Sequence, residues 1–229
     1  MKQLIQIICI VVMIYSGVQL AKYIYTYFAV EKELEEVQQV VQHAELRALQ
    51  DINPRIVGWL TLGGTRLDNP VLQATDNDFY LRHNYKDEES RGGSIFMDFR
   101  NDAAELERHT IFYGHVLRNG TMFGDLAKFA EQAYATEYPV LFYETTKKKY
   151  ELHVFAAYET TTDFYYIETD FTDDSYMTFV NEIQARSVIT MPVTVNEMDK
   201  IVTFSTCTTS ANDEERFVVH AKVVEMTNY

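Results

Sequence analysis

From Ile56 onward the chain is a succession of short apolar runs separated by turn residues, and this spacing constrains the fold more than any other feature. The runs are rich in Val, Ile, Phe, Tyr and Thr, which favour strands. Turn residues separate them at Gly63-Gly64, Asn69-Pro70, Gly92-Gly93 and Asn119-Gly120. The runs themselves are Arg55–Leu62, Thr110–Tyr113, Val140–Tyr143, Tyr150–Tyr158, Lys200–Ser205 and Phe217–Val224. Many short strands at this spacing predict a mostly β fold, either a closed barrel or a sandwich.

Two helical additions are expected within this β pattern. The segment Asp174–Ser187 carries Tyr176, Phe179, Val180 and Ile183 at helical spacing. A second stripe, in the segment Thr121–Tyr134, consists of Met122, Phe123, Leu126 and Phe129. Both stripes indicate helices that face the core rather than a ligand.

The N-terminal segment is almost entirely apolar from Leu4 to Ala21. At a rise of about 1.5 Å per residue this helix would span about 27 Å, close to the thickness of a bilayer's hydrocarbon core. The tyrosines that follow suit the membrane–water interface. A cleaved signal peptide would have a shorter apolar region followed by a small-residue cleavage site. Residues 1–30 are therefore predicted to be an uncleaved transmembrane anchor.

A second helical segment follows the anchor. Glu31–Gln50 has an approximate apolar stripe among Glu and Gln and contains no Gly or Pro, and Asn53-Pro54 is expected to end it. Residues 31–54 are predicted to be a helical linker, either packed on the domain that follows or extended as a solvated stalk. Residues 55–229 are predicted to form that domain.

Composition limits the partners of the chain. The formal net charge of −14 argues against a nucleic-acid backbone as partner, because such a partner requires a cationic face. Apolar residues make up 47% of the sequence, enough for a packed core without disulfides. No zinc-ligand spacing, EF-hand loop or phosphate-binding glycine loop is present in the sequence, so no metal or other cofactor is expected.

The chain has two cysteines, and only Cys207 belongs to the β-rich part, because Cys9 lies in the apolar N-terminus. Cys207 ends one β-patterned run, and Arg216 begins the next run nine residues later. If the two runs are neighbours in a sheet, a thiol and a guanidinium lie side by side at one end of it. The guanidinium could then stabilise an oxyanion formed when the thiol attacks a carbonyl. His115, which follows Thr110–Tyr113 and a glycine, offers a base.

Each of these residues also has a simpler interpretation. A lone cysteine is more often an inert core residue, although the neighbours of Cys207 are Ser and Thr. Arg216 could pair with an acid close by in sequence, which would be Asp213, Glu214 or Glu215. A single histidine is normally not catalytic, and 92 residues separate His115 from Cys207, so only the fold can join them.

Several motifs in register resemble class B sortases, over roughly residues 55 to 225. They are Gly58-Trp59-Leu60, Asn69-Pro70-Val71-Leu72-Gln73, Asp76-Asn77-Asp78-Phe79-Tyr80-Leu81, Gly93-Ser94-Ile95-Phe96-Met97-Asp98, Tyr113-Gly114-His115, Ser205-Thr206-Cys207 and Arg216. The resemblance implies a closed sortase-type β-barrel of about eight strands. It also implies an N-terminal helix packed on the barrel and a helix between the sixth and seventh strands.

The resemblance further implies a membrane-anchored cysteine transpeptidase whose catalytic domain lies outside a Gram-positive cell. Such enzymes cleave a C-terminal sorting motif of the Asn-Pro-x-Thr-Gly, Ser-Pro-x-Thr-Gly or Asn-Pro-x-Thr-Asn kind after its threonine. They then pass the acyl group to an amine of a peptidoglycan precursor or cross-bridge. Cys207 would be the nucleophile, His115 the acid and base, and Arg216 the oxyanion donor.

The same resemblance implies a set of peptide contacts, for which ordinary barrel packing is the alternative. They are Asn77, Leu81, Thr162, Tyr166, Ile167 and Ser205. Two other functions stay open at this point. A pilus-polymerising sortase would use a lysine of another pilin and carry a lid over its site, and a catalytically silent surface-binding module would use the barrel without the chemistry.

Overall fold

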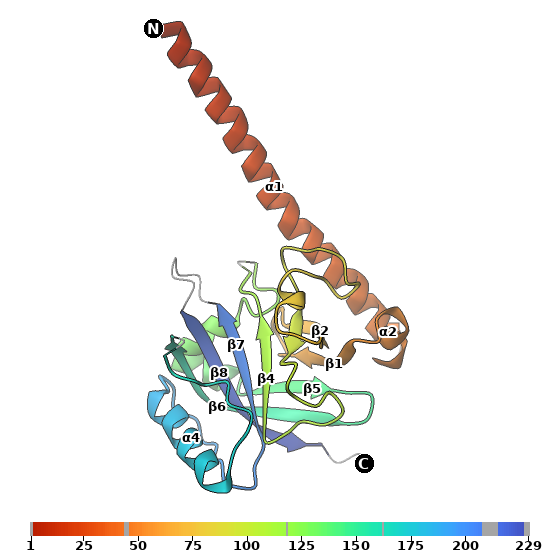
Figure 1. The fold of residues 1–229 in the computed structure, drawn as a ribbon, viewed down its shortest axis with the longest axis vertical. Coiled ribbons are helices and arrows are strands. Elements are labelled where there is room, and N and C mark those ends of the chain that lie inside the picture. The colour runs from red at the N-terminus through yellow and green to blue at the C-terminus, as the bar shows by residue number, and fades with distance from the viewer. Residues whose placement is uncertain (1, 44–45, 118, 162, 208–214, 227–229) are drawn as a thin grey trace.

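The computed structural model describes residues 2–43, 46–117, 119–161, 163–207 and 215–226. In these ranges eight strands close into a barrel in the order β1-β2-β3-β4-β7-β8-β6-β5. The strands β2 and β3, and likewise β4 and β7, are parallel, and the other neighbours are antiparallel. The closed barrel of about eight strands predicted from the sequence is confirmed (Figure 1). The strands are β1 (Ile56–Thr61), β2 (Asp68–Leu72), β3 (Ile95–Met97), β4 (His109–Gly114), β5 (Val140–Glu144), β6 (Lys149–Thr160), β7 (Ile201–Cys207) and β8 (Arg216–Glu225).

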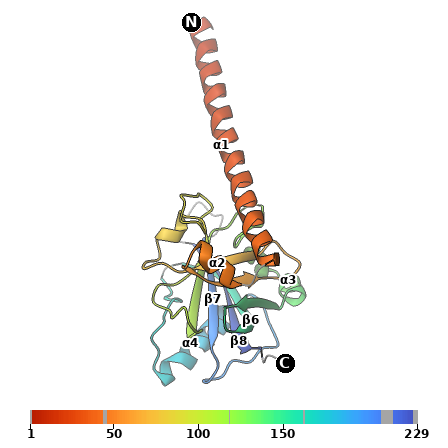
Figure 2. The ribbon, with the colours of Figure 1, turned by 90° about the vertical axis from the view of Figure 1, so that its right-hand side faces the viewer.

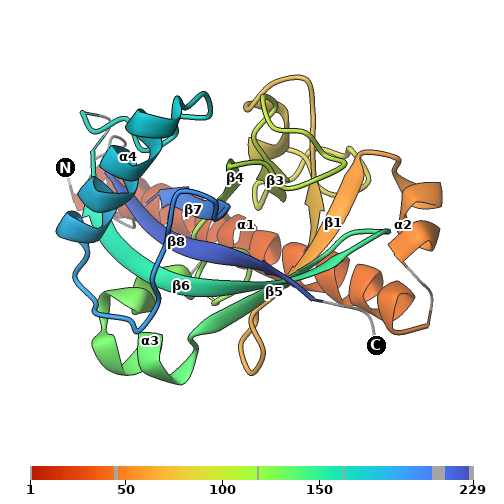
Figure 3. The ribbon, with the colours of Figure 1, turned by 90° about the horizontal axis from the view of Figure 1, so that it is seen from below.

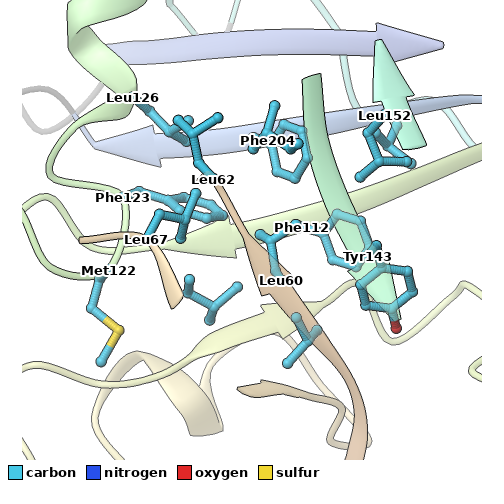
Figure 4. Close-up of a cluster of buried hydrophobic side chains, with 14 of the residues drawn as sticks. Leu60, Leu62, Leu67, Phe112, Met122, Phe123, Leu126, Tyr143, Leu152 and Phe204 are labelled. Carbon is cyan, nitrogen blue, oxygen red and sulfur yellow. The ribbon is translucent and has the colours of Figure 1, made fainter. Parts of the chain in front are cut away.

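Aromatic rings from different strands fill the barrel interior (Figure 4). The rings of Phe112 on β4 and Phe204 on β7 stack with centroids 5.6 Å apart, and Phe112 also contacts Tyr143 on β5 at 5.1 Å. All are almost fully buried, and burying one such side chain contributes about 1.5–3 kcal/mol. On β1, a Cβ at Gly58 would overlap the Tyr143 ring, so the barrel closes there only because the residue has no side chain. This packing fixes the strand ends that carry the site.

The predicted helix between the sixth and seventh strands is present as α4 (Asp173–Arg186). Thr172 caps it, accepting a hydrogen bond from the Ser175 N–H. The predicted apolar stripe packs on β6, where Tyr176, Val180 and Ile183 are fully buried. Seen from below, α4 and α2 lie on opposite sides of the barrel, and α1 passes behind it (Figure 3).

The prediction of one helix over Thr121–Tyr134 was wrong. The structure has a turn there, then a 3₁₀ helix, η2 (Leu126–Ala130), and a short α3 (Gln132–Glu137). The turn is tight because Met122 has a positive φ of 53° and the Cβ position of Gly124 is blocked by the backbone carbonyl of Leu117. Met122 and Phe123 are still buried in the core (Figure 4). The prediction that the stripe faces the core was therefore correct, and the prediction of a helical backbone was not.

The N-terminal helix α1 (Lys2–His43) is one continuous helix, followed by α2 (Leu46–Ile52). Its second half packs on the barrel through Val30, Leu34 and Val37, and α2 adds the fully buried Leu49. Glu31 of α1 also pairs with Arg66 of the β1–β2 turn, at 2.9 Å. The linker therefore packs on the domain and is not a solvated stalk.

The first half of α1 extends beyond the barrel (Figure 2). Its apolar side chains are exposed. Within the described residues, it belongs to the one helix that is long and apolar enough to cross a membrane. A signal sequence would satisfy the same criterion of length and composition. The domain limits at residues 30 and 54 stay predictions.

Candidate active site

Three neighbouring strand ends place the predicted catalytic residues at one end of the barrel. In the parallel pair β4–β7, Gly114 is the partner of Thr206, so His115 and Cys207 each follow directly after this pair. In the antiparallel pair β7–β8, Cys207 is itself the partner of Arg216. The backbones of Cys207 and Arg216 therefore lie side by side, as the sequence predicts.

A groove of about 340 Å³ lies beside these strand ends. It is lined by Asn77, Leu81, Phe96, Tyr113, Gly114, His115, Tyr166, Ile167, Ser205, Thr206 and Arg216. The lining contains each of the sequence-predicted site residues except Cys207 and Thr162. Cys207 is placed by the register of β7, next to the lining residue Thr206, and Thr162 lies outside the described residues.

The imidazole of His115 is held by the backbone on the neighbouring wall. Its Nε2 lies 2.8 Å from the carbonyl oxygen of Leu81. Because a carbonyl only accepts, Nε2 carries the proton, and Nδ1 has the lone pair in the neutral ring. Gly93 packs directly against this arrangement with a positive φ of 57°, and a Cβ there would lie 2.6 Å from the Tyr80 carbonyl oxygen and 3.1 Å from His115 Cδ2.

Arg216 is half-buried and lines the groove. Its Nη1 donates to the backbone carbonyl of Glu215 at 2.8 Å, which fixes the direction of the side chain. Asp213 and Glu214, two of the acids considered as its ion-pair partners, lie outside the described residues. A guanidinium fixed in this way can donate to a carbonyl or oxyanion that enters the groove.

One wall of the groove is closed by a side-chain hydrogen bond. The hydroxyls of Tyr166 and Ser205 lie 2.9 Å apart, and both side chains are buried. This bond ties the connection between β6 and α4 to β7, two residues before Cys207. The adjacent Ile167 adds apolar surface to the same wall. Ser205 thus shapes the groove through Tyr166.

Another wall of the groove is formed around the 3₁₀ helix η1 (Phe79–Leu81). Asn77, just before η1, donates from Nδ2 to Asp98 at 3.0 Å and accepts at Oδ1 from the Phe99 N–H at 3.0 Å. Leu81 ends η1 and contributes both its side chain to the lining and its carbonyl to His115. The two residues predicted here lie together on the same wall.

The sequence analysis missed several groove residues. They are Phe96, Tyr113, Gly114 and Thr206. All lie within the strings that carry the sortase resemblance, next to residues that were chosen, so proximity in sequence to those residues was the available signal.

A second groove, of about 430 Å³, has no counterpart in the sequence analysis. It shares Leu81 and His115 with the first groove, so the imidazole stands between the two. Its remaining lining residues are Arg82, Glu89, Ser90 and Arg91. No cluster of His, Cys, Asp and Glu side chains suited to a metal ion occurs among the described residues.

Comparison with known proteins decides the family. The model of the sortase domain matches residues 61–224. Sortase B of Listeria monocytogenes is 46% identical, the match covering 79% of this chain and 74% of that protein. Sortase B of Staphylococcus aureus is 38% identical over 98% of this chain and 97% of that protein. This chain belongs to the sortase B family.

Solved sortase B structures have the same fold. A Staphylococcus aureus sortase B–substrate complex superposes with a TM-score of 0.81 at 38% identity, covering 87% of this chain and 98% of that chain. A Bacillus anthracis protein described as similar to sortase B gives 0.81 at 43% identity, covering 88% and 98%. The family and the enzyme class predicted from the motifs, a sortase B-type cysteine transpeptidase, are confirmed.

Proposed function

We propose that this sortase B cleaves a C-terminal sorting motif after its threonine and joins the secreted protein to an amine of the cell wall. The motif is of the Asn-Pro-x-Thr-Gly, Ser-Pro-x-Thr-Gly or Asn-Pro-x-Thr-Asn kind. The observation that carries the proposal is the register of β4, β7 and β8, by which His115, Cys207 and Arg216 lie at or next to three neighbouring strand ends beside a groove. A relative of known structure is a sortase B–substrate complex.

In the first step, His115 Nδ1 takes the proton of the Cys207 thiol, and the resulting thiolate sulfur attacks the carbonyl carbon of the threonine. The C–S bond forms, the carbonyl electron pair moves to oxygen, and Arg216 donates hydrogen bonds to the oxyanion. The C–N bond then breaks as His115 gives a proton to the leaving amine. Since Nε2 is engaged by the Leu81 carbonyl, Nδ1 is the nitrogen that carries the transferred proton. The product is a thioester on Cys207.

In the second step, an amine attacks the thioester. His115, now neutral, takes a proton from the amine at Nδ1, the new C–N bond forms, and the C–S bond breaks to release the thiolate. The second groove is a candidate path for the amine because it shares Leu81 and His115 with the peptide groove. Its lining carries one carboxylate, Glu89, beside the guanidinium groups of Arg82 and Arg91, so an ammonium group would have to bind Glu89 directly. A related sortase B has been solved in complex with triglycine, which carries such an amine.

The N-terminal helix supports a place at the membrane. The barrel end that holds the last residue of β7 and the first of β8 lies on the same side of the barrel as the apolar half of α1 (Figure 1). If Leu4–Ala21 spans the bilayer, the site faces the membrane surface from which a secreted protein emerges. We propose a single-pass membrane protein with its catalytic domain outside the cell.

Pilin polymerisation is the less supported alternative. A pilus-polymerising sortase would need a lid over the site, and the described residues that line the peptide groove all come from Asn77 and beyond. The N-terminal helices pack instead beside β1 and β2. A lysine-bearing acceptor is included in the assay below to test this alternative.

The test uses the full chain in detergent micelles with quenched peptides that carry each of the three motifs and Leu-Pro-x-Thr-Gly. Mass spectrometry locates the broken bond, with and without triglycine or a lysine peptide as acceptor. Cleavage after threonine, lost in Cys207→Ala, is the expected result. A folded protein whose thiol is alkylated by iodoacetamide but which cleaves none of the peptides would contradict the proposal.

A further inference from the structure

We infer that Asp98 and Arg100 are positioning residues that join the two walls of the peptide groove and set the orientation in which Asn77 presents its amide to the peptide. The inference rests on the proposed function for the nature of that peptide. Neither residue lines the groove itself, so both act through residues that do. The hydrogen bonds of Asp98 and Arg100 carry this inference.

Asp98 is a fully buried carboxylate that collects donors from the surrounding segments. Its Oδ2 accepts from Asn77 Nδ2 at 3.0 Å, from the Tyr113 hydroxyl at 2.8 Å and from Arg100 Nη2 at 2.8 Å. The backbone N–H of Asp98 donates to the Ile111 carbonyl at 2.9 Å, which anchors the residue to β4. One carboxylate thereby fixes two groove-lining side chains, Asn77 and Tyr113.

The contacts on either side of the Asn77 amide exclude its flipped orientation. An ionised carboxylate only accepts hydrogen bonds, so the NH₂ group must face Asp98, and the Phe99 N–H donates to Oδ1 at 3.0 Å. A flipped amide would place oxygen against oxygen on one side and N–H against N–H on the other. Asp98 uses one hydrogen of the NH₂ group, and the second can donate to a peptide carbonyl in the groove that Asn77 lines.

The charge state of this network is fixed at neutral pH. Burial opposes ionisation of Asp98, but hydrogen bonds from Arg100 and Tyr113 outweigh it and hold the pKa of the carboxyl below its usual value. Burial and the adjacent negative charge raise the pKa of Tyr113 well above its usual value, so its hydroxyl stays a donor. At neutral pH Asp98 therefore stays an ionised acceptor, and the hydrogen bond that orients the Asn77 amide is kept.

Arg100 carries the connection to the wall that contains Ile167. Its Nε donates to Asp98 Oδ1 at 2.9 Å, its Nη2 donates to both Asp98 and the Ile167 carbonyl, the latter at 2.9 Å, and its Nη1 donates to the Tyr165 hydroxyl at 3.1 Å. Ile167 is part of the wall that Tyr166 and Ser205 close. Only the planar fork of an arginine can make all these bonds at once, and the single ammonium of a lysine cannot.

A purely structural ion pair is the alternative, and the barrel contains a matched control. Asp199, before the start of β7 and thus at the end opposite Cys207, accepts from Lys222 at 2.8 Å. Its side chain is 18% exposed and is also anchored by a backbone N–H, that of Asn196. Asp199→Asn therefore removes a partly buried carboxylate far from the groove.

The test compares steady-state cleavage of the best sorting peptide by the full chain and by Arg100→Lys, Asp98→Asn, Asn77→Ala, the Asp98→Asn/Asn77→Ala double variant and Asp199→Asn. Loss of charged hydrogen bonds that orient a binding group is expected to raise KM about tenfold in Arg100→Lys and Asp98→Asn, with kcat within about threefold. In the Asn77→Ala background Asp98→Asn should raise KM by less than about threefold more, because the two act through one amide.

Asp199→Asn should lower Tm and leave KM unchanged. Fully multiplicative effects of Asp98→Asn and Asn77→Ala on KM, or an unchanged KM in Arg100→Lys, would overturn the inference.

Hydrogen–deuterium exchange tests the clamp, formed by Asp98 and Arg100, without any activity. Arg100→Lys should speed exchange in peptides covering residues 163–168 and 76–81, and Asp199→Asn should not. If wild type cleaves no peptide but these segments are loosened, the proposed function fails and the clamp stands. If wild type cleaves and exchange is unchanged in Arg100→Lys, the clamp fails and the function stands. Should Asp98→Asn not fold, Tyr113→Phe removes one bond to the same carboxylate and takes its place, with the same expected rise in KM.

Discussion

Cys207 and Arg216 are direct cross-strand partners, the last residue of β7 and the first residue of β8. One pair earlier on β7, Thr206 is the partner of Gly114 on β4, which His115 follows. The positions of all three candidate catalytic residues are thus set by strand register in the barrel. A site built in this way on paired strands is more rigid than a site built on loops alone.

The first prediction concerns the charge beside the nucleophile. Arg216→Ala is expected to lower kcat/KM for the sorting peptide by about 10²–10³, the usual cost of losing one oxyanion donor. Arg216→Lys should restore part of the activity, because it returns a charge without the planar fork. The measurement is peptide cleavage together with the rate of Cys207 alkylation by iodoacetamide. Equal cleavage by Arg216→Ala and wild type would show that another group stabilises the oxyanion.

The second prediction concerns the glycine beneath His115. Gly93→Ala adds a Cβ where the chain has a positive φ and where the Tyr80 carbonyl and the imidazole leave no room. We expect a loss of about 1–3 kcal/mol in the free energy of unfolding and a fall in kcat greater than the fall in Tm explains. Gly63→Ala is the control, since a Cβ there meets no atom within 4 Å. The measurements are Tm and kcat for both variants.

The sequence was sufficient for the strands that carry the chemistry. Strand runs ending at Cys207 and starting near Arg216 are apolar, short and bounded by polar residues, and the register that joins them follows from their being neighbours in a closed barrel. The contact between His115 and the Leu81 carbonyl was beyond such reasoning, because the two residues are 34 positions apart in sequence and no periodic pattern joins them.

The residues of the clamp were missed for a different reason. Asp98 and Arg100 act through hydrogen bonds to segments far away in sequence, at Asn77 and Ile167. A pattern of side-chain types along one strand carries no information about such partners. The failed helix over Thr121–Tyr134 has a local cause, since backbone turns at Gly120 and Met122 override an apolar spacing that a helix and a turn can share.

The third prediction concerns pH and a buried histidine pair. Glu168 O accepts from His109 Nδ1 at 2.6 Å, and His109 Nε2 accepts from the Thr203 hydroxyl at 2.6 Å. Thr203 Oγ1 in turn accepts from His220 Nδ1 at 2.7 Å, and His220 Nε2 accepts from the Tyr158 hydroxyl at 3.0 Å. This directed chain requires both imidazoles to be neutral.

Burial lowers the pKa of His109 from 6.5 to about 4 and lowers that of His220 well below its ordinary value. The unfolded chain therefore binds more protons below about pH 6.5, and the free energy of unfolding should fall as pH drops from about 6.5 to about 4. The loss is on the order of 3 kcal/mol for His109 alone. Urea unfolding at a series of pH values should show this slope, and His109→Asn should reduce it by about half. A slope unchanged in His109→Asn would assign the pH dependence to other groups.

The fourth prediction concerns the second groove. If the acceptor amine approaches His115 past Glu89, replacing that carboxylate by an amide removes the negative charge that binds an ammonium group and leaves Arg82 and Arg91 to repel it. Glu89→Gln is then expected to raise the triglycine concentration needed for half-maximal transpeptidation by about 3- to 10-fold, as for loss of a partly screened charge pair. Glu88→Gln is the control, because it makes the same change of net charge one residue away and does not line the groove.

The measurement is the ratio of transpeptidation product to hydrolysis product by mass spectrometry, over a range of ionic strength. A screened charge attraction weakens with salt, so the difference between Glu89→Gln and wild type should shrink at about 0.5 M NaCl. If both variants partition the acyl-enzyme as wild type does, the amine enters by another route.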